Sequence, residues 1–259
     1  MLPRLAQNTL TTLRDLYTAR YFHDPRKAPR YRGLYPTYEA TLAALPKGEL
    51  HGFEDESVPE YFEKYLLAFN TGDYPVLFWM QKTLGPGSTV FDFGGGLGQC
   101  FYGYQEFMQF PAGLRWTVCD VESQAKHGAK VAKERKAENL FFTTDRQQAS
   151  GVTFFLTNGA LQYVAEDLSE ILGKLPELPH HVIVNRVPMY DGKPYYTVQS
   201  SLHSFVPHRV FNFQEFTGQI KNLGYELAGE WKLPRTLHVQ FHPELFVDSF
   251  KGLYFRRTK

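Results

Sequence analysis

The clearest chemical pattern in this sequence is the stretch VFDFGGGLG, at residues 90–98. An acid, Asp92, is followed by four glycines: Gly94, Gly95, Gly96 and Gly98. Glycine permits positive φ angles and lets a ligand approach the backbone closely. A helix that begins behind such a turn offers unpaired N–H groups. The pattern therefore predicts a ligand-binding turn with a carboxylate held beside it.

Two common glycine-rich patterns do not fit this stretch. A P-loop ends in a lysine followed by Ser or Thr, and no lysine follows here. The dinucleotide fingerprint GxGxxG also fails, because its sixth position is Gln99 when counted from Gly94 and Phe101 when counted from Gly96. Phosphate transfer from ATP or GTP is therefore disfavoured, and an NAD-dependent oxidoreductase remains only as a weaker alternative.

Strand and helix signals alternate from about residue 86 onward. Short apolar or β-rich runs lie at 88–94, 114–122, 139–145, 151–159, 180–189, 225–231 and 252–257. Helical spacing separates most of them, whereas the last two have no helix between them. We therefore expect an α/β, Rossmann-like, seven-stranded and mostly parallel sheet with helices on both faces and an antiparallel C-terminal strand.

The first part of the chain has a different pattern. Ser57 and Glu60 have the spacing of a capping box before aromatic residues at helical intervals, and Asp73 precedes a second helical run that starts with Tyr74 and Pro75. We expect residues 1–85 to form a helical N-terminal cap that closes over an acceptor. Residues 86–259 would then form the cofactor-binding domain.

Polar residues follow the predicted strands at their carboxyl ends, the edge at which open α/β sheets bind ligands. Asp120 ends the second strand, where an acid can accept hydrogen bonds from both hydroxyls of a ribose. Glu122 is the second choice for that role. Asp145 follows the third strand, and Asn158 and Gly159 end the fourth, although a plain turn would also explain all three.

The acid and alternating glycines at 92–98 resemble motif I of the class I S-adenosylmethionine-dependent methyltransferases. The resemblance implies S-adenosylmethionine as cofactor, with its methionine part on the glycine loop and its ammonium near Asp92, directly or through water. It also implies that Asp120 binds the ribose and that Asp145 lies near the adenine amino group. Asn158 and Gly159 would lie at the edge that faces the methyl-transfer centre.

The chain from about residue 30 to its end is also similar to a bacterial family of methyltransferases associated with polysaccharide gene neighbourhoods. The similar stretches include YPVLFW, VFDFGGGLG, GALQYV, VIVNRVPMYD, RVFNFQEF, LGYELAGEW and GLYFRR. One departure is the third glycine of GGG, where many relatives carry a bulkier residue. This resemblance implies O-methylation of a small-molecule or sugar-type acceptor.

Candidate residues for the acceptor side lie near the fourth and fifth strands and in the long segment between the fifth strand and the next helix, which we expect to be a loop. His203 is the preferred base, since a neutral imidazole can take a proton from a hydroxyl. Arg186 could bind an anionic acceptor or form a structural salt bridge. Tyr163 could contact the donor or the acceptor, or serve only in packing. His180 and His181 have no carboxylate or cysteine at suitable spacing, so we expect no metal site.

The overall composition favours a cytoplasmic protein. The 28 basic and 27 acidic residues nearly balance, which argues against a nucleic-acid partner. The N-terminus lacks the apolar core of a signal peptide, no apolar run is long enough to span a membrane, and the two cysteines suggest no disulfide framework. A non-catalytic binding or scaffold protein on the same fold is the main alternative to an enzyme.

Overall fold

The computed structural model describes residues 4–24, 27, 30–47, 52–53, 57–201 and 204–258. All seven strands expected from the sequence are present, and they lie in the order β4-β3-β2-β5-β6-β12-β9. Their bounds are β2 (Thr89–Phe93), β3 (Arg115–Cys119), β4 (Leu140–Thr143), β5 (Phe154–Asn158), β6 (His181–Tyr190), β9 (Tyr225–Leu233) and β12 (Phe250–Arg257). Neighbours from β4 to β6 pair in parallel, whereas β12 is antiparallel to both β6 and β9. The predicted Rossmann-like class and the antiparallel C-terminal strand are confirmed.

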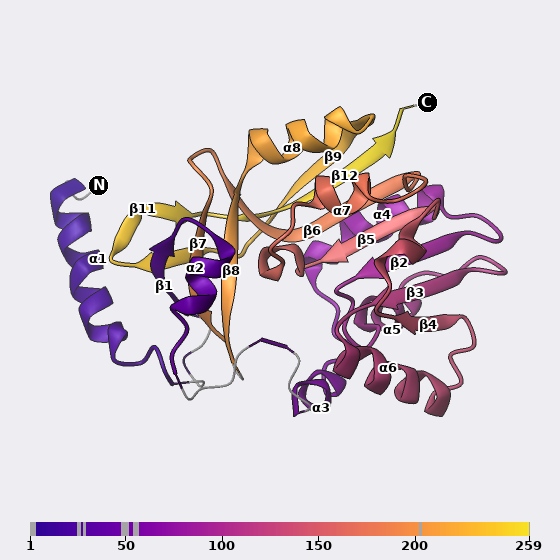
Figure 1. Cartoon of the computed structure of the whole chain (residues 1–259), viewed down its shortest axis with the longest axis horizontal. Helices are drawn as coiled ribbons and strands as arrows, with labels where there is room; N and C mark the ends of the chain where they lie inside the picture. The colour runs from indigo at the N-terminus through magenta and orange to yellow at the C-terminus, as the bar shows by residue number, and fades with distance from the viewer. Residues whose placement is uncertain are drawn as a thin grey trace.

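Helices cover both faces of these seven strands (Figure 1). One face packs against α4 (Tyr74–Thr83), α5 (Gln99–Gln105) and α6 (Glu122–Glu134), and the other against α7 (Leu168–Gly173) and α8 (Phe213–Asn222). Large apolar side chains fill both layers, with Trp116 fully buried in the first and Phe155 in the second. The side chain of Asn212 caps α8 by accepting a hydrogen bond from the Glu215 N–H at 2.8 Å.

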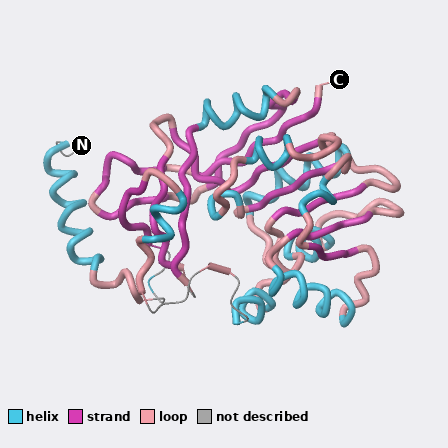
Figure 2. The backbone as a smooth tube through the Cα atoms, viewed as in Figure 1, coloured by secondary structure: helices cyan, strands magenta, loops and turns pink. Residues whose placement is uncertain are grey.

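The sheet continues beyond the seven predicted strands. Five more extend it in the order β11-β10-β1-β7-β8-β6, and Figure 2 shows the strands as one curved sheet. They are β1 (Arg30–Tyr35), β7 (Tyr195–Ser200), β8 (Phe205–Asn212), β10 (Leu237–Gln240) and β11 (His242–Val247). The stretch between β6 and α8, which we expected to be a loop, therefore contains β7 and β8.

The N-terminal segment, expected to be a helical cap, contains a strand as well as helices. It contains α1 (Arg4–Ala19), α2 (Tyr38–Ala43), α3 (Ser57–Glu63) and the 3₁₀ turn η2 (Thr71–Asp73), but also strand β1. β1 is short and mostly polar, and it is held between β7 and β10 by long-range pairing that local sequence patterns do not reveal. α4, the last element of the segment, packs in the core of the seven-stranded region.

Strand β6 changes partner along its length. It pairs with β5 from His181 to Asn185, and with β8 at Met189 and Tyr190. Arg186 lies between these two stretches with a φ of 59°, and the register of β12 against β6 shifts nearby. This irregularity is a β-bulge, a feature that bends a strand and redirects a side chain. It lies beside the carboxyl end of β5.

Candidate functional site

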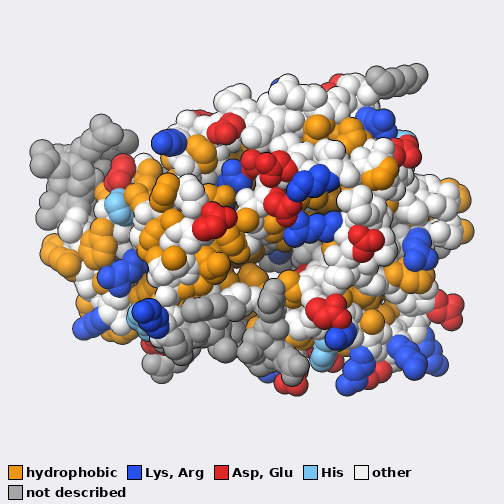
Figure 3. All heavy atoms as spheres, viewed as in Figure 1, with side chains coloured by type: hydrophobic (Ala, Val, Ile, Leu, Met, Phe, Trp, Pro, Cys, Tyr) orange, Lys and Arg blue, Asp and Glu red, His pale blue; other side chains and the backbone are white. Residues whose placement is uncertain are grey.

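A large cavity of about 1360 Å³ opens at the carboxyl ends of β2, β3 and β5. Figure 3 shows the surface hollowed near the middle of this face, with charged side chains around the hollow. The N-terminal segment contributes part of the wall, including Pro59, Phe62 and Asp73. The N-terminal segment also contacts α6 through Glu63, whose Oε2 lies 2.9 Å from Nε2 of His127, a residue of the cavity wall.

The glycine loop forms one wall of this cavity, lined by Gly94, Gly95 and Gly96. Gly94, Gly96 and Gly98 have φ angles of 70°, 57° and 90°, which side-chain-bearing residues rarely adopt. The protein's own packing also requires small residues here. A Cβ on Gly94 would lie 2.2 Å from Ala160 Cβ, and one on Gly95 would lie 2.5 Å from Asp92 Cγ. Gly98 does not line the cavity but precedes α5 as its N-cap.

Asp92 lies beneath the loop rather than in the cavity wall. Its side chain is fully buried, with Oδ2 accepting a hydrogen bond from Trp116 Nε1 at 3.2 Å. Its Oδ1 has no hydrogen-bond partner among the described residues. Burial raises the pKa of Asp92 to about 7, although the Trp116 hydrogen bond opposes this rise. A positive charge above the loop would favour the ionised form.

Asp120 does line the cavity, at the end of β3 and beside the glycine loop. Its Oδ2 accepts a hydrogen bond from the Gly96 N–H at 2.7 Å, and its Oδ1 accepts one from the Val121 N–H at 2.8 Å. Burial raises the pKa of Asp120, while these two hydrogen bonds lower it. Because a carboxylate accepts about four hydrogen bonds, Asp120 keeps capacity for a ligand. Glu122 also lines the cavity, but it pairs with Lys126 at 3.0 Å.

Asp145 is exposed and lies outside the cavity wall. Its side chain accepts a hydrogen bond from the Gln147 N–H at 2.9 Å and so caps the 3₁₀ turn η3 (Arg146–Ala149). Its neighbours Thr144 and Arg146 do line the cavity. In this structure Asp145 therefore has the turn role that the sequence also allowed.

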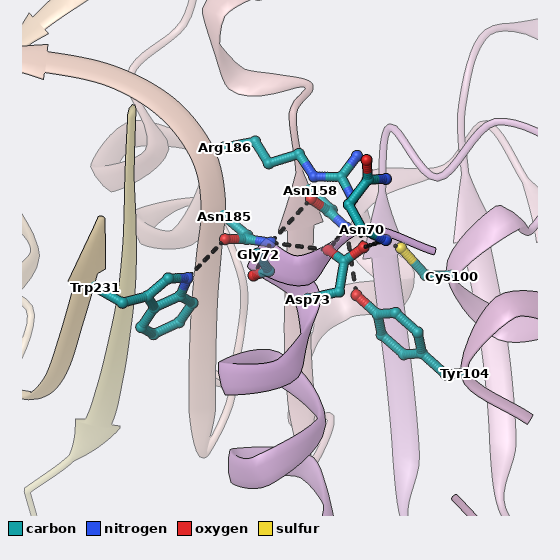
Figure 4. A network of polar contacts seen from close by, with 9 residues as sticks. All are labelled: Asn70, Gly72, Asp73, Cys100, Tyr104, Asn158, Asn185, Arg186 and Trp231. Carbon is teal, nitrogen blue, oxygen red and sulfur yellow. Dashed lines mark hydrogen bonds and ion pairs between the residues drawn. The ribbon is translucent and has the colours of Figure 1, made fainter. Parts of the chain in front are cut away.

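Asn158 belongs to a polar network at the other end of the cavity (Figure 4). Its amide nitrogen lies 3.1 Å from Asp73 Oδ1, 3.2 Å from Cys100 Sγ and 3.3 Å from Tyr104 Oη. Its Oδ1 accepts a hydrogen bond from Asn185 Nδ2 at 3.2 Å. Gly159, which follows, lines the cavity with a φ of 80°.

Asp73 is the centre of this network, and the sequence indicated it only as the start of a helix. It is buried at the end of η2, and its carboxylate pairs with the Arg186 guanidinium. It also accepts a hydrogen bond from Asn185 Nδ2 at 3.1 Å. In turn, Trp231 Nε1 donates to Asn185 Oδ1 at 3.0 Å. Asp73 thus connects the N-terminal segment to the carboxyl end of β5 and to the middle of β6.

Tyr163 lines the cavity from the 3₁₀ turn η4 (Leu161–Tyr163). Its hydroxyl donates to Gln199 Oε1 at 3.1 Å, and its ring meets Phe53 and His208 edge-on at 5.1 and 5.3 Å between centroids. Burial lowers the pKa of His208 well below its usual range, and neither ring nitrogen has a hydrogen-bond partner among the described residues. His203, the base predicted from the sequence, lies outside the described residues.

In the described part of the chain, no helix is both long and apolar enough to cross a membrane. In the same residues, no three His, Cys, Asp or Glu side chains gather in a way that could hold a metal ion. His181, one of the histidine pair noted in the sequence, instead contacts the Tyr254 hydroxyl through Nδ1 at 2.9 Å.

The sequence matches no protein-family model and no curated protein, but its fold is similar to solved structures. Magnesium protoporphyrin IX methyltransferase from Synechocystis PCC 6803, solved with bound SAH, aligns with a TM-score of 0.50 and 13% identity over 80% of this chain and 96% of that enzyme. A candidate sarcosine dimethylglycine methyltransferase from Galdieria sulphuraria aligns with a TM-score of 0.50 and 11% identity over 79% of this chain and 99% of that one. Mitomycin 7-O-methyltransferase aligns with a TM-score of 0.47 and 16% identity over 79% of this chain, which spans 59% of that enzyme's length. At such identities the first two matches identify the fold alone: this chain has the Rossmann-like fold of the class I S-adenosylmethionine-dependent methyltransferases.

Proposed function

We propose that this protein is an S-adenosylmethionine-dependent methyltransferase that binds its cofactor between the glycine loop and Asp120. The observation that carries the proposal is the position of Asp120. Its carboxylate lines the cavity at the tip of β3, is fixed by two backbone N–H groups and retains free acceptor capacity. An acid in this position suits the two hydroxyls of a ribose.

The remaining cavity residues fit the other parts of this cofactor. Gly94, Gly95 and Gly96 present backbone rather than side chains to the cavity, which allows the methionine part to lie close. Asp92 is enclosed below them, so we propose that its charge acts on the ammonium through the loop and not by contact. A cavity of about 1360 Å³ exceeds the roughly 300–1,000 Å³ of ordinary ligand pockets, leaving room for an acceptor beside the cofactor.

The chain would accelerate methyl transfer mainly by positioning. When bound, the cofactor supplies an electrophilic methyl group on a positively charged sulfur. Holding an acceptor oxygen against that group in a closed site provides much of the acceleration, so a dedicated base is optional. Asn158, Tyr163 and Arg186 line the end of the cavity where we propose that the acceptor binds. The N-terminal wall residues Pro59 and Phe62 would exclude water as a lid.

The finer assignments remain proposals. We infer O-methylation of a small-molecule or sugar-type acceptor, on the resemblance to the bacterial family associated with polysaccharide genes. The role of His203 as the base and the role of Asp145 near the adenine also remain predictions. For Asp145, its exposed position favours a capping role instead.

Calorimetric titration with S-adenosylmethionine and S-adenosylhomocysteine tests the proposed function. We expect binding of both, and loss of binding in Gly96→Arg, because that side chain would enter the cofactor site. Gly87→Arg is the matched control, since Gly87 also has a positive φ but lies in open space outside the cavity wall. Folded wild-type protein that binds neither compound would refute the proposal. Binding of NADH instead would support an oxidoreductase, and cofactor binding without methyl transfer to any extract component would support a scaffold.

A further inference from the structure

The acceptor end of the cavity contains an arginine in a strained backbone conformation. Arg186 has a φ of 59°, in the left-handed region that non-glycine residues rarely occupy. Such conformations persist only where the surrounding structure enforces them, and they cluster at functional sites. The bulge at Arg186 lets its side chain line the cavity.

Asp73 fixes one side of the Arg186 guanidinium. Its carboxylate receives four donors, which are Arg186 Nη2, the side-chain amides of Asn158 and Asn185, and the backbone N–H of Asn70. Four donors fill the acceptor capacity of a carboxylate, so Asp73 is held firmly in place. The ion pair therefore orients the guanidinium (Figure 4).

Arg186 keeps most of its hydrogen-bonding capacity for the cavity. A guanidinium has five N–H donors, and among the described residues only Asp73 accepts from it. The side chain of Arg186 is 26% exposed, whereas that of Asp73 is 2% exposed. The free donors of Arg186 therefore face the cavity rather than the protein interior.

The surroundings of Arg186 favour an anionic partner. The other polar groups around it, Asn158, Tyr104 and the Cys100 thiol, are uncharged, since burial raises the pKa values of the phenol and the thiol. A planar guanidinium with adjacent free donors suits a carboxylate or a phosphate. An anion bound here would also be attracted to the positively charged sulfur of the cofactor. We propose that Arg186 binds an acidic group of the methyl acceptor, an inference that rests on the proposed function.

Binding of matched acidic and neutral probes tests this inference. The probes are glucuronate and glucose 6-phosphate against glucose, and benzoate against benzamide. Dissociation constants are measured by ligand-observed NMR, with and without S-adenosylhomocysteine. We expect at least one acid to bind wild-type protein about tenfold more tightly than its neutral partner, as one charge-assisted contact predicts. A preference for glucuronate or benzoate over glucose 6-phosphate would identify the group as a carboxylate, and the reverse would identify a phosphate.

Variants connect the preference to Arg186. Arg186→Gln should abolish it, and Arg186→Lys should retain part of it, because a lysine keeps the charge but loses the planar donor pair. Arg256→Gln is the control, since Arg256 also forms an ion pair, with Glu226, but on the exposed surface. If no acid is preferred in any pair, or if the preference survives in Arg186→Gln, the inference is wrong. Should Arg186→Gln fail to fold, Arg186→Lys and the wild-type comparison still decide. Failure of S-adenosylhomocysteine to bind would instead refute the proposed function. The two failures are distinguishable, because the preference for an acid is also measured in the absence of S-adenosylhomocysteine.

Discussion

Replacing Gly94 with alanine should destabilise the protein for two reasons, one in the backbone conformation and one in side-chain packing. Gly94 has a φ of 70°, and the left-handed conformation costs a residue with a Cβ about 1–2 kcal/mol. The new Cβ would also lie 2.2 Å from Ala160 Cβ, where carbon atoms normally stay about 3.5–4 Å apart. Overpacking of this kind costs about 1–3 kcal/mol. We therefore expect Gly94→Ala to lower the free energy of unfolding by about 2–5 kcal/mol.

Gly87 provides the matched control for the backbone part. Its φ is 75°, and a Cβ built on it meets nothing within 4 Å. Gly87→Ala should therefore lower the free energy of unfolding by only about 1–2 kcal/mol. The difference between the two variants measures the steric part. Adding Ala160→Gly to Gly94→Ala removes the obstructing methyl group, so the double variant should recover most of that difference.

Urea unfolding followed by circular dichroism measures the three variants, and Ala160→Gly alone completes the double-mutant cycle. Calorimetry with S-adenosylhomocysteine then tests the functional consequence. Gly94→Ala should weaken binding because the loop must move, and Gly87→Ala should not. Equal destabilisation by Gly94→Ala and Gly87→Ala would refute this reasoning. So would a coupling energy between positions 94 and 160 below about 0.5 kcal/mol, the range found for independent sites.

Three other substitutions have expected outcomes. The pKa of Asp92 is raised from 3.8 to about 7, so between these values the folded state holds a proton that the unfolded state releases, and the free energy of unfolding should fall as the pH rises from about 4 to about 7. Urea unfolding at several pH values should show that Asp92→Asn flattens this fall. The same pH dependence in the variant and the wild type would contradict the role given to Asp92. Asp73→Asn leaves the Arg186 guanidinium without its counter-ion and should lower the free energy of unfolding by about 3 kcal/mol. A loss below about 1 kcal/mol, which is typical of ion pairs on the surface, would show that the network contributes little to stability. Asp120→Asn removes a charged hydrogen-bond acceptor worth about 1.5–3 kcal/mol, so the Kd for S-adenosylhomocysteine should rise about 10–100-fold. Asp248→Asn serves as the control, because Asp248 is exposed. Equal Kd values for the two variants would exclude a ribose role for Asp120.

The seven-stranded core could be predicted from the sequence because its signals are local. Most of the strands are short apolar runs bounded by turn residues, helical spacing separates most of them, and some helices carry a recognisable cap, such as Asn212 before α8. The glycine loop was also found, because positive φ angles require a residue type that the sequence shows directly. These features depend on residues close to one another in the chain.

The parts that sequence reasoning missed depend on distant contacts. Asp73 meets Asn185 and Arg186, more than a hundred positions later in the chain, and nothing in the local pattern around Asp73 indicates that meeting. Likewise, β1 is stabilised as a strand by its pairing with β7 on one side and β10 on the other. β7 and β8 had a local signal, since both are rich in aromatic and β-branched residues. Their position beside the predicted acceptor site led us to expect a loop there.

The structure also changes which residue best tests the proposed cofactor. A loop whose glycines are required by Ala160 and Asp92 would keep those glycines without any ligand, so the glycine pattern alone cannot separate a binding site from a tight turn. Asp120 differs, because two backbone N–H groups hold it while its remaining capacity faces a cavity. Burial of a carboxylate that raises its pKa is unfavourable unless its remaining lone pairs find donors, and Asp120 is only partly buried, in the cavity wall. Under the proposed function a ribose would supply those donors, so loss of binding in Asp120→Asn is stronger support for the cofactor than loss in any glycine variant.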